Sequence, residues 1–272
     1  MSSEEHIFFS EHNDEEMLAA KSRAQETFKY FWRELSWERR RIIPGLDLAS
    51  VKVVFTDQNV AEGEPDVEHM WIDEVDFDGE YITGFLINKP NWLRNISEGD
   101  HVKAKISDIS DWMFAVSGRV YGAFSVNLLR SRMSQSELKS HDQAWGLDFG
   151  NPNHIDLVYV PRRKGMLAKL LNLKGQIDPE EEQRALIEHP MSLNMGQSLI
   201  DELSKSDELI HSVDDNGWTT LHSEALAGNL TSVVILLEHG ADKTLRTKSG
   251  KTALDLARSL NWDHVVDVLT KD

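Results

Sequence analysis

The histidine and aspartate residues between positions 141 and 156 are the side chains whose types and spacing could bind a metal ion or exchange protons. His141 and Asp142 are followed by Asp148, His154 and Asp156. Imidazole and carboxylate groups serve both as zinc ligands and as general acids or bases. Loops rich in Asp, Asn and His also form turns without any ligand. We favour turns here, and predict no catalytic residue, no metal site and no bound cofactor.

Other catalytic and nucleotide-binding motifs are absent from the sequence. It contains no HExxH zinc motif, no GxGxxG or Walker glycine loop, and no GxSxG nucleophile elbow. It has no cysteine, which excludes disulfides, a thiolate nucleophile and Cys-ligated zinc. Glu68 and His69 are adjacent in a predicted strand, so their side chains point to opposite faces and cannot form a dyad. The sequence therefore favours binding over catalysis.

The charge of the chain restricts its partners. Its 272 residues include 46 acidic and 29 basic side chains, a formal net charge of −17. Because nucleic-acid phosphates are repelled by this charge, we expect no nucleic-acid partner. The acidic surface could steer a basic protein onto the chain, or it could serve only to keep the chain dissolved.

The length of the apolar runs and the character of the first residues bear on location. No apolar run approaches the roughly 18 residues of a membrane span. Residues 1–16 carry six acidic and no basic residues, unlike a secretory signal. We expect a cytoplasmic protein that does not contact a membrane.

Hydrophobic periodicity predicts one helix and several strands in the first half. Asn13 and Glu16 form a capping-box pattern, and apolar residues then recur at helical spacing, which predicts a helix over about 14–40. From Ser50 the period changes to two. The predicted strands cover residues 51–55, 67–77, 80–88, 101–109, 111–116 and 119–126, with Asp78-Gly79 as a hairpin turn. One helix followed by about six antiparallel strands indicates an α+β domain.

Several short motifs in these strands carry a family resemblance. They are Glu68-His-Met-Trp71, Gly84-Phe-Leu-Ile-Asn88-Lys-Pro90, Gly99-Asp100-His-Val102, Ile109-Ser-Asp111-Trp112 and the stretch from Gly118 to Gly122. Behind an aromatic-rich helix, over residues 14–130, this pattern resembles the bacterial YegJ-like family, a domain of unknown function. The resemblance implies a fold and no activity.

Residues 131–189 form a connecting segment between the two halves. We predict a short helix around Ser134–Lys139 and a strand over Ile155–Val160. The basic triplet Arg162-Arg163-Lys164 could contact an acidic partner or acidic groups of the same chain, and we favour the second in a chain this acidic.

The end of the chain contains an internal repeat. Gly217, Thr219, Leu221, Val233 and Leu236 recur 33 positions later as Gly250, Thr252, Leu254, Val266 and Leu269. A period of 33 with this pattern resembles the ankyrin repeat, which implies an all-α segment of paired helices joined by hairpin loops. Thr219 and Thr252 should cap first helices. A degenerate copy around Leu193–Leu203 brings the total to about two and a half repeats over 190–272. Because such arrays need about three, we expect the first half to supply a cap.

The repeat departs from the ankyrin pattern at informative positions. Glu224 stands where a small apolar residue is usual, and must reach a partner or solvent because an unpaired buried carboxylate is costly. Asn261-Trp262 replaces the expected Gly-His. Thr220, Ala253 and Asp255 also depart from the ankyrin pattern. Ankyrin proteins usually recognise partners with hairpin tips and inner-helix ends, and the resemblance places these at Asp215, Asn216, Trp218, Leu226, Lys248, Ser249 and Lys251. Trp218 either packs on the first half or stands exposed as a binding anchor. In the first case the acidic stretch Glu62–Glu80 is the alternative binding surface.

These observations predict a polar leader at 1–13, an α+β YegJ-like domain at 14–130, the connecting segment and the ankyrin repeats. The function we predict is non-catalytic binding of another protein in a bacterium, such as an immunity protein that neutralises a basic toxin by stoichiometric binding. A general adaptor or regulator, or an uncharacterised enzyme with its site in the strand-rich half, are the alternatives.

Overall fold

The computed structural model describes residues 14–160 and 178–271. The leader 1–13, with Asn13, and the triplet Arg162–Lys164 lie outside these ranges. The elements of the first part are α1 (Glu15–Glu38), β1 (Leu48–Thr56), β2 (Val67–Phe77), β3 (Tyr81–Leu86), β4 (His101–Lys105), β5 (Ile109–Val116), β6 (Arg119–Gly122), α2 (Phe124–Ser131) and α3 (Gln135–Trp145). Those of the second part are α5 (Pro179–Ile187), α6 (Pro190–Leu203), α7 (Glu208–His211), α8 (Thr220–Ala227), α9 (Leu230–Glu238), α10 (Ala253–Ser259) and α11 (Asp263–Thr270). No helix in the described ranges has both the length and the apolar character needed to cross a membrane.

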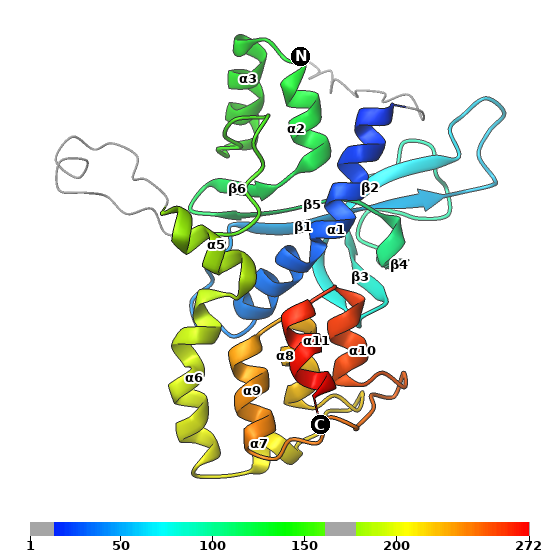
Figure 1. Ribbon diagram of the computed structural model, residues 1–272. Coiled ribbons are helices and arrows are strands. Elements are labelled where there is room, and N and C mark those ends of the chain that lie inside the picture. Colours follow the sequence, from blue (N-terminus) through cyan, green and yellow to red (C-terminus); the bar gives the residue numbers. More distant parts are fainter. Residues whose placement is uncertain (1–13, 161–177, 272) are drawn as a thin grey trace, which may run out of the picture.

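The six strands form one antiparallel sheet in the order β4-β3-β2-β1-β5-β6. Helix α1 covers one face of this sheet (Figure 1), with Ala24, Phe28 and Phe31 buried against it. The indole Nε1 of Trp112, on β5, donates a hydrogen bond of 3.0 Å to the Ala24 carbonyl. Apolar residues at helical spacing in α1 and at alternate positions in β1 create this core. The α+β prediction for this part is confirmed.

The start of α1 differs from the prediction by one residue. Asp14 is the N-cap, and its Oδ1 accepts hydrogen bonds from the backbone N–H groups of Glu16 and Met17 at 3.0 and 3.4 Å. An aspartate at this position supplies the same acceptor as an asparagine and also carries a charge that the helix dipole favours.

Two predicted strands end early. The strand expected over 101–109 stops at Lys105, where a short 3-10 helix at Ile106–Asp108 turns the chain into β5. The strand expected over 119–126 stops at Gly122, and α2 begins at Phe124. The reason is the buried carboxylate of Asp111, which accepts hydrogen bonds from the N–H groups of Phe124 and Ser125, both at 2.8 Å. These contacts fix the first turn of a helix.

The secondary structure predicted for the segment after β6 was less accurate. The short helix expected at 134–139 is longer, since α3 runs from Gln135 to Trp145. The strand expected over 155–160 is wrong, because residues 151–160 have no regular secondary structure. This segment instead crosses the outer edge of β6, where the Asp156 carbonyl accepts the Gly122 N–H at 2.8 Å.

The second part has the paired helices of ankyrin repeats. Thr219 caps α8 and Thr252 caps α10, each accepting a hydrogen bond from the backbone N–H three residues later, as predicted. Helix α8 ends at Gly228, whose φ is +72° and whose missing Cβ leaves room for the Trp262 ring. Helix α6 packs on α9 at the other end of the stack. The prediction of a helical ankyrin segment is confirmed.

Candidate functional site: a groove between the two parts

Helix α1 joins the sheet and the ankyrin repeats, and its second half packs on the inner helix α8 (Figure 1). The guanidinium of Arg40 forms an ion pair of 2.7 Å with Glu224, whose side chain is 6% exposed. The indole Nε1 of Trp37 donates to Asn229 Oδ1 at 3.1 Å, and Asn229 in turn donates to Glu224 at 2.7 Å. The partner that Glu224 required is therefore supplied by the first part of the same chain.

The last repeat contacts α1 through residues that depart from the ankyrin pattern. Trp262 is buried, and its ring packs edge-on against Tyr30 with centroids 6.0 Å apart. The Lys29 ammonium lies over the Trp262 ring and donates to the Asn261 carbonyl at 3.2 Å. The surface that ankyrin repeats commonly offer to a partner is thus covered in part by α1.

Buried polar groups complete this contact. Glu34 accepts a hydrogen bond of 3.1 Å from His189, the residue that caps α6. Burial alone would raise the pKa of Glu34, but the hydrogen bond from His189 and the charge of Arg41 hold that pKa below its ordinary value. Arg33 donates to the carbonyls of Ala185 and Leu186 at the end of α5, and burial lowers its pKa to about 10.

A groove of about 710 Å³ remains beside this contact, between the end of α1, the turn after β2 and the two ankyrin hairpins, which turn at residues 214–218 and 247–251. Its volume lies in the usual range of small-molecule sites, roughly 300–1,000 Å³. The residues that line it are Trp32, Ser36, Arg39, Arg40, Asp76, Phe77, Asp78, Asp214, Asn216, Trp218, Ser223, Leu226, Lys248 and Ser249.

The groove contains most of the residues that the ankyrin resemblance pointed to. Asn216, Trp218, Leu226, Lys248 and Ser249 line it. Trp218 is partly buried, between the two alternatives considered for it. Leu226 is 1% exposed, so it belongs to the wall and offers almost no surface of its own.

Two of the expected contact residues lie outside the groove. Asp215 is exposed on the hairpin but does not line it. Lys251 forms an ion pair of 3.2 Å with Glu80, so it helps to hold the second hairpin against the β2–β3 turn.

The two hairpins are held as one rigid edge. Asp214 Oδ1 accepts hydrogen bonds from the N–H groups of Asn216 and Trp218 at 2.8 and 2.7 Å. The Asn216 carbonyl accepts the Lys248 N–H at 2.8 Å. A Cβ on Gly217, whose φ is +80°, would lie 2.9 Å from that Lys248 nitrogen, so the close contact needs glycine. The position of Trp218 is thereby fixed by backbone contacts.

The opposite wall takes Asp76, Phe77 and Asp78 from the acidic stretch Glu62–Glu80, the alternative binding surface, and adds Arg39, which the sequence did not single out. Arg39 forms an ion pair of 2.9 Å with Asp76 and donates to the Val75 carbonyl at 2.7 Å. Its guanidinium also lies over the Trp32 ring, 5.1 Å from the centroid. Only the docking of the two parts brings this wall opposite the hairpins, although the departures at Glu224 and Trp262 were a signal that such docking occurs.

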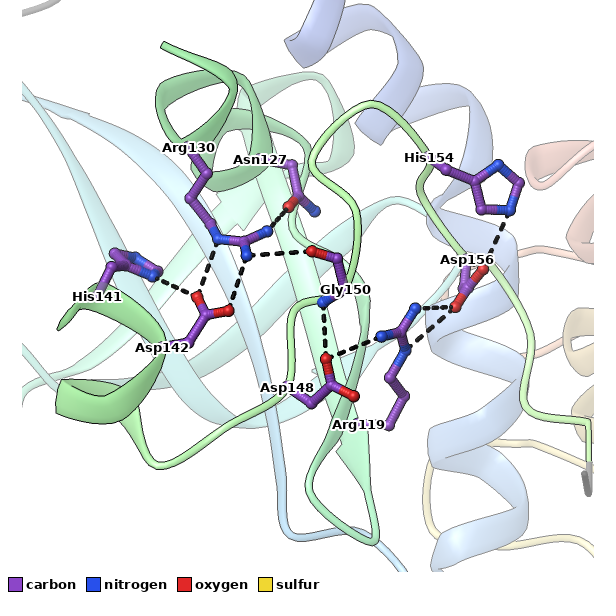
Figure 2. A network of polar contacts seen from close by, with 9 residues as sticks. All are labelled: Arg119, Asn127, Arg130, His141, Asp142, Asp148, Gly150, His154 and Asp156. Atoms are coloured by element: carbon purple, nitrogen blue, oxygen red, sulfur yellow. Dashed lines mark hydrogen bonds and ion pairs between the residues drawn. The ribbon is translucent and has the colours of Figure 1, made fainter. Parts of the chain in front are cut away.

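The histidine and aspartate residues between 141 and 156 are organised around two arginines (Figure 2). Arg130 forms an ion pair of 2.8 Å with Asp142, and Arg119 pairs with Asp148 and Asp156 at 3.0 and 2.7 Å. Gly150 joins the two groups, because its N–H donates to Asp148 and its carbonyl accepts from Arg130.

The two histidines lie at the outer ends of this network. His141 contacts Asp142 at 3.0 Å, and His154 contacts Asp156 at 3.3 Å. Within residues 14–160 and 178–271, no group of three or more His, Asp or Glu side chains is arranged to hold a metal ion. The carboxylates neutralise arginines that fasten the 146–156 segment to β6 and α2.

The polar residues of the YegJ-like motifs also have structural contacts. Glu68 accepts hydrogen bonds from the N–H groups of Asn91, Trp92 and Leu93, which fixes the loop after β3. Asn88 accepts the Trp71 N–H at 3.3 Å. These side chains therefore hold loops in place.

Comparison with known proteins agrees with this two-part structure. Residues 14–149 match the family described as an uncharacterised protein conserved in bacteria (DUF2314), and residues 207–257 match ankyrin repeats. A protein of Neisseria meningitidis serogroup B, named as an ankyrin repeat protein, is 43% identical over 263 residues, 97% of this chain and 96% of that protein.

Two further relatives each cover one part. The YegJ protein of Escherichia coli K12 is 30% identical over 83 residues, which are 30% of this chain and 50% of that protein. A human NAD-capped RNA hydrolase is 39% identical over 67 residues, which are 25% of this chain and only 14% of that protein. The chain thus belongs to the bacterial DUF2314 family, to which YegJ is related, and in it the DUF2314 domain is joined to ankyrin repeats.

Proposed function

We propose that this protein binds another protein stoichiometrically, without catalysis of its own, at the groove between α1 and the ankyrin hairpins. Ankyrin repeats point to protein partners, and the observation that carries the proposal is the groove of about 710 Å³ lined by exposed hairpin residues. Its rigid edge favours binding, because a preorganised surface loses little conformational entropy when a partner docks.

The narrower form of the proposal is an immunity protein that acts in the cytoplasm and occludes a basic toxin. The net charge of −17 supports a basic partner, because it accelerates the encounter with a positively charged protein. Occlusion needs only a tight one-to-one complex, for which a groove with fixed walls is suited.

Co-purification of the tagged full-length chain from its source bacterium, followed by mass spectrometry and light scattering, tests the proposal. We expect one partner in a one-to-one complex, and the narrower form requires that this partner be toxic when expressed alone and harmless together with the chain. Several loosely bound partners would support a general adaptor instead. Turnover of a small molecule without any protein partner would contradict the proposal and favour an enzyme.

For the contact itself, Trp218→Ala should weaken the complex by at least about tenfold, as expected for an aromatic anchor. Trp145→Ala is the matched control, because Trp145 is an exposed tryptophan at the end of α3 that does not line the groove. Equal affinities of the two variants would show that the binding surface lies outside the groove.

A further inference from the structure

The charges that line the groove are unequally compensated within the chain. Arg39 is neutralised by Asp76, and Arg40 by Glu224. Among the described residues, neither Asp78 nor Asp214 has a lysine or arginine nitrogen within 4.0 Å, and Lys248, which also lines the groove, has no carboxylate oxygen within that distance. The charges that no ion pair in residues 14–160 and 178–271 balances are therefore two carboxylates and one ammonium, an excess of one negative charge.

Each of these carboxylates has one oxygen committed to a turn. Asp78 Oδ1 accepts the N–H groups of Glu80 and Tyr81 at 2.9 and 2.7 Å. Asp214 Oδ1 accepts the N–H groups of Asn216 and Trp218. These bonds hold each carboxylate in position, and within the described chain they leave both Oδ2 atoms available to a cation.

One aromatic side chain with exposed surface lines the same groove. Trp218 is partly exposed, and its backbone N–H donates to the Asp214 carboxylate. A carboxylate and an indole in one groove suit the guanidinium of arginine or the ammonium of lysine, which can gain a charge pair from the first and a cation–π contact from the second. On the other wall, Trp32 and Phe77 pack edge-on with centroids 5.6 Å apart, but both are buried, so they support the wall and offer almost no apolar surface of their own.

We infer that the groove binds an extended segment of the partner protein that carries two basic side chains. One of them lies on Trp218 and pairs with Asp214, and the other pairs with Asp78. This inference rests on the proposed function, and it specifies the chemistry of the partner and the residues that recognise it.

Fluorine NMR of the full-length chain labelled with 5-fluorotryptophan tests the inference without knowledge of the partner. The probes are two capped hexapeptides, Gly-Leu-Arg-Leu-Arg-Gly and Gly-Leu-Glu-Leu-Glu-Gly, and Trp218→Phe assigns the resonance of Trp218. We expect the basic peptide to shift this resonance saturably, with an affinity that falls as salt is added. The inference is wrong if the acidic peptide binds as well, or if the basic peptide leaves the resonance unchanged.

Charge variants locate the binding. The double variant Asp78→Asn with Asp214→Asn removes two charges, while Oδ1 of each asparagine can still accept the turn hydrogen bonds. The affinity for the basic peptide should fall about tenfold, because two ion pairs worth up to about 1 kcal/mol each are lost. The control is Glu202→Gln with Asp267→Asn, which removes the same charge from exposed positions on α6 and α11. Equal weakening in both variants would reduce the effect to net charge and overturn the inference.

The same variants separate this inference from the proposed function. If a partner is captured and both double variants bind it equally, the groove assignment fails and the binding function stands. If the basic peptide binds the groove as described but no protein partner exists, the proposed function fails.

Discussion

Arg40, two residues after the end of α1, and Glu224 on α8 are 184 positions apart in the chain and form an ion pair of 2.7 Å that connects the DUF2314 domain to the ankyrin repeats. Glu224 is the residue that departs from the small apolar side chain usual at this place in the repeat. Its second oxygen accepts a hydrogen bond from Asn229, which also accepts from Trp37. The departure from the repeat pattern is thus explained by the contact between the two parts.

We expect Arg40→Ala to lower the free energy of unfolding by about 1–3 kcal/mol. The substitution leaves the buried Glu224 carboxylate without its cation, which costs up to about 3–5 kcal/mol when both groups of a pair are buried. The expected cost is smaller here because Arg40 is 37% exposed and solvent weakens the pair. Urea unfolding followed by tryptophan fluorescence measures the change. Arg39→Ala, which breaks the more exposed pair with Asp76, should cost less than about 1 kcal/mol. A larger effect of Arg39→Ala would contradict this ranking.

Residues 190–272 expressed alone should not fold cooperatively. The fragment would expose Leu226, Leu256 and Trp262, which are buried in the full chain, and two and a half repeats bury too little apolar surface on their own. Circular dichroism of the fragment should show no sigmoidal thermal transition, with the full chain as the control. A cooperative transition would mean that the repeats are independent of the first part.

Replacement of Asp111 should destabilise the start of α2. Its carboxylate accepts the N–H groups of Phe124 and Ser125 and the Ser125 hydroxyl, and burial raises its pKa. Asp111→Ala leaves these donors without an acceptor, so we expect a loss of about 2–4 kcal/mol. Guanidinium unfolding checks this value against Asp267→Ala, a substitution on an exposed face of α11. A loss of less than about 1 kcal/mol would show that another group can cap the helix.

Acidification should destabilise the ankyrin repeats through His222. Burial lowers the pKa of this histidine below its ordinary 6.5. Its Nδ1 accepts the Thr219 N–H at 3.1 Å and its Nε2 lies 3.1 Å from the Leu245 carbonyl, an arrangement that suits the neutral ring. Because the unfolded chain binds the proton more readily, the stability that His222 contributes is complete above its unfolded pKa and is lost as the pH falls through 6.5 toward the folded pKa.

The measurement is the free energy of unfolding as a function of pH. Between about pH 7 and pH 5, this free energy should fall less steeply for His222→Gln than for the unchanged chain. At position 222 a histidine can take up a proton on unfolding and a glutamine cannot. Parallel curves would show that His222 does not contribute to the pH dependence.

The helices and strands with strong periodicity were predictable because one face of each is buried against a single core. Helix α1 and β2 follow this rule. The two ankyrin caps, Thr219 and Thr252, were predictable from the repeat pattern. The start of α2 was not predictable, because its cap is Asp111, a side chain from β5 that reaches it through tertiary structure. The strand expected over 155–160 failed for a similar reason, since Asp156 is held by Arg119.

The candidate site was half predictable. Trp218 and Lys248 follow from the repeat pattern, because every ankyrin hairpin presents those positions. Asp76 lies in the acidic stretch Glu62–Glu80 that was considered as a binding surface, but its pairing with Arg39 opposite the hairpins depends on how α1 docks, which no local pattern encodes. Glu224 and Trp262 were the available signal, since residues that break a repeat pattern must satisfy a contact outside the repeat.

The carboxylate of Glu68 has a further consequence for small anions. It occupies a ring of three backbone N–H groups, from Asn91, Trp92 and Leu93, and such rings bind phosphate or sulfate in other proteins. An anion tethered to the same chain competes at a high effective concentration, so dissolved phosphate would have to displace a competitor that never diffuses away. Substitution of Glu68 by glutamine or alanine would remove that competitor, and the loop between β3 and β4 would then be the place where an inorganic anion could restore the lost order.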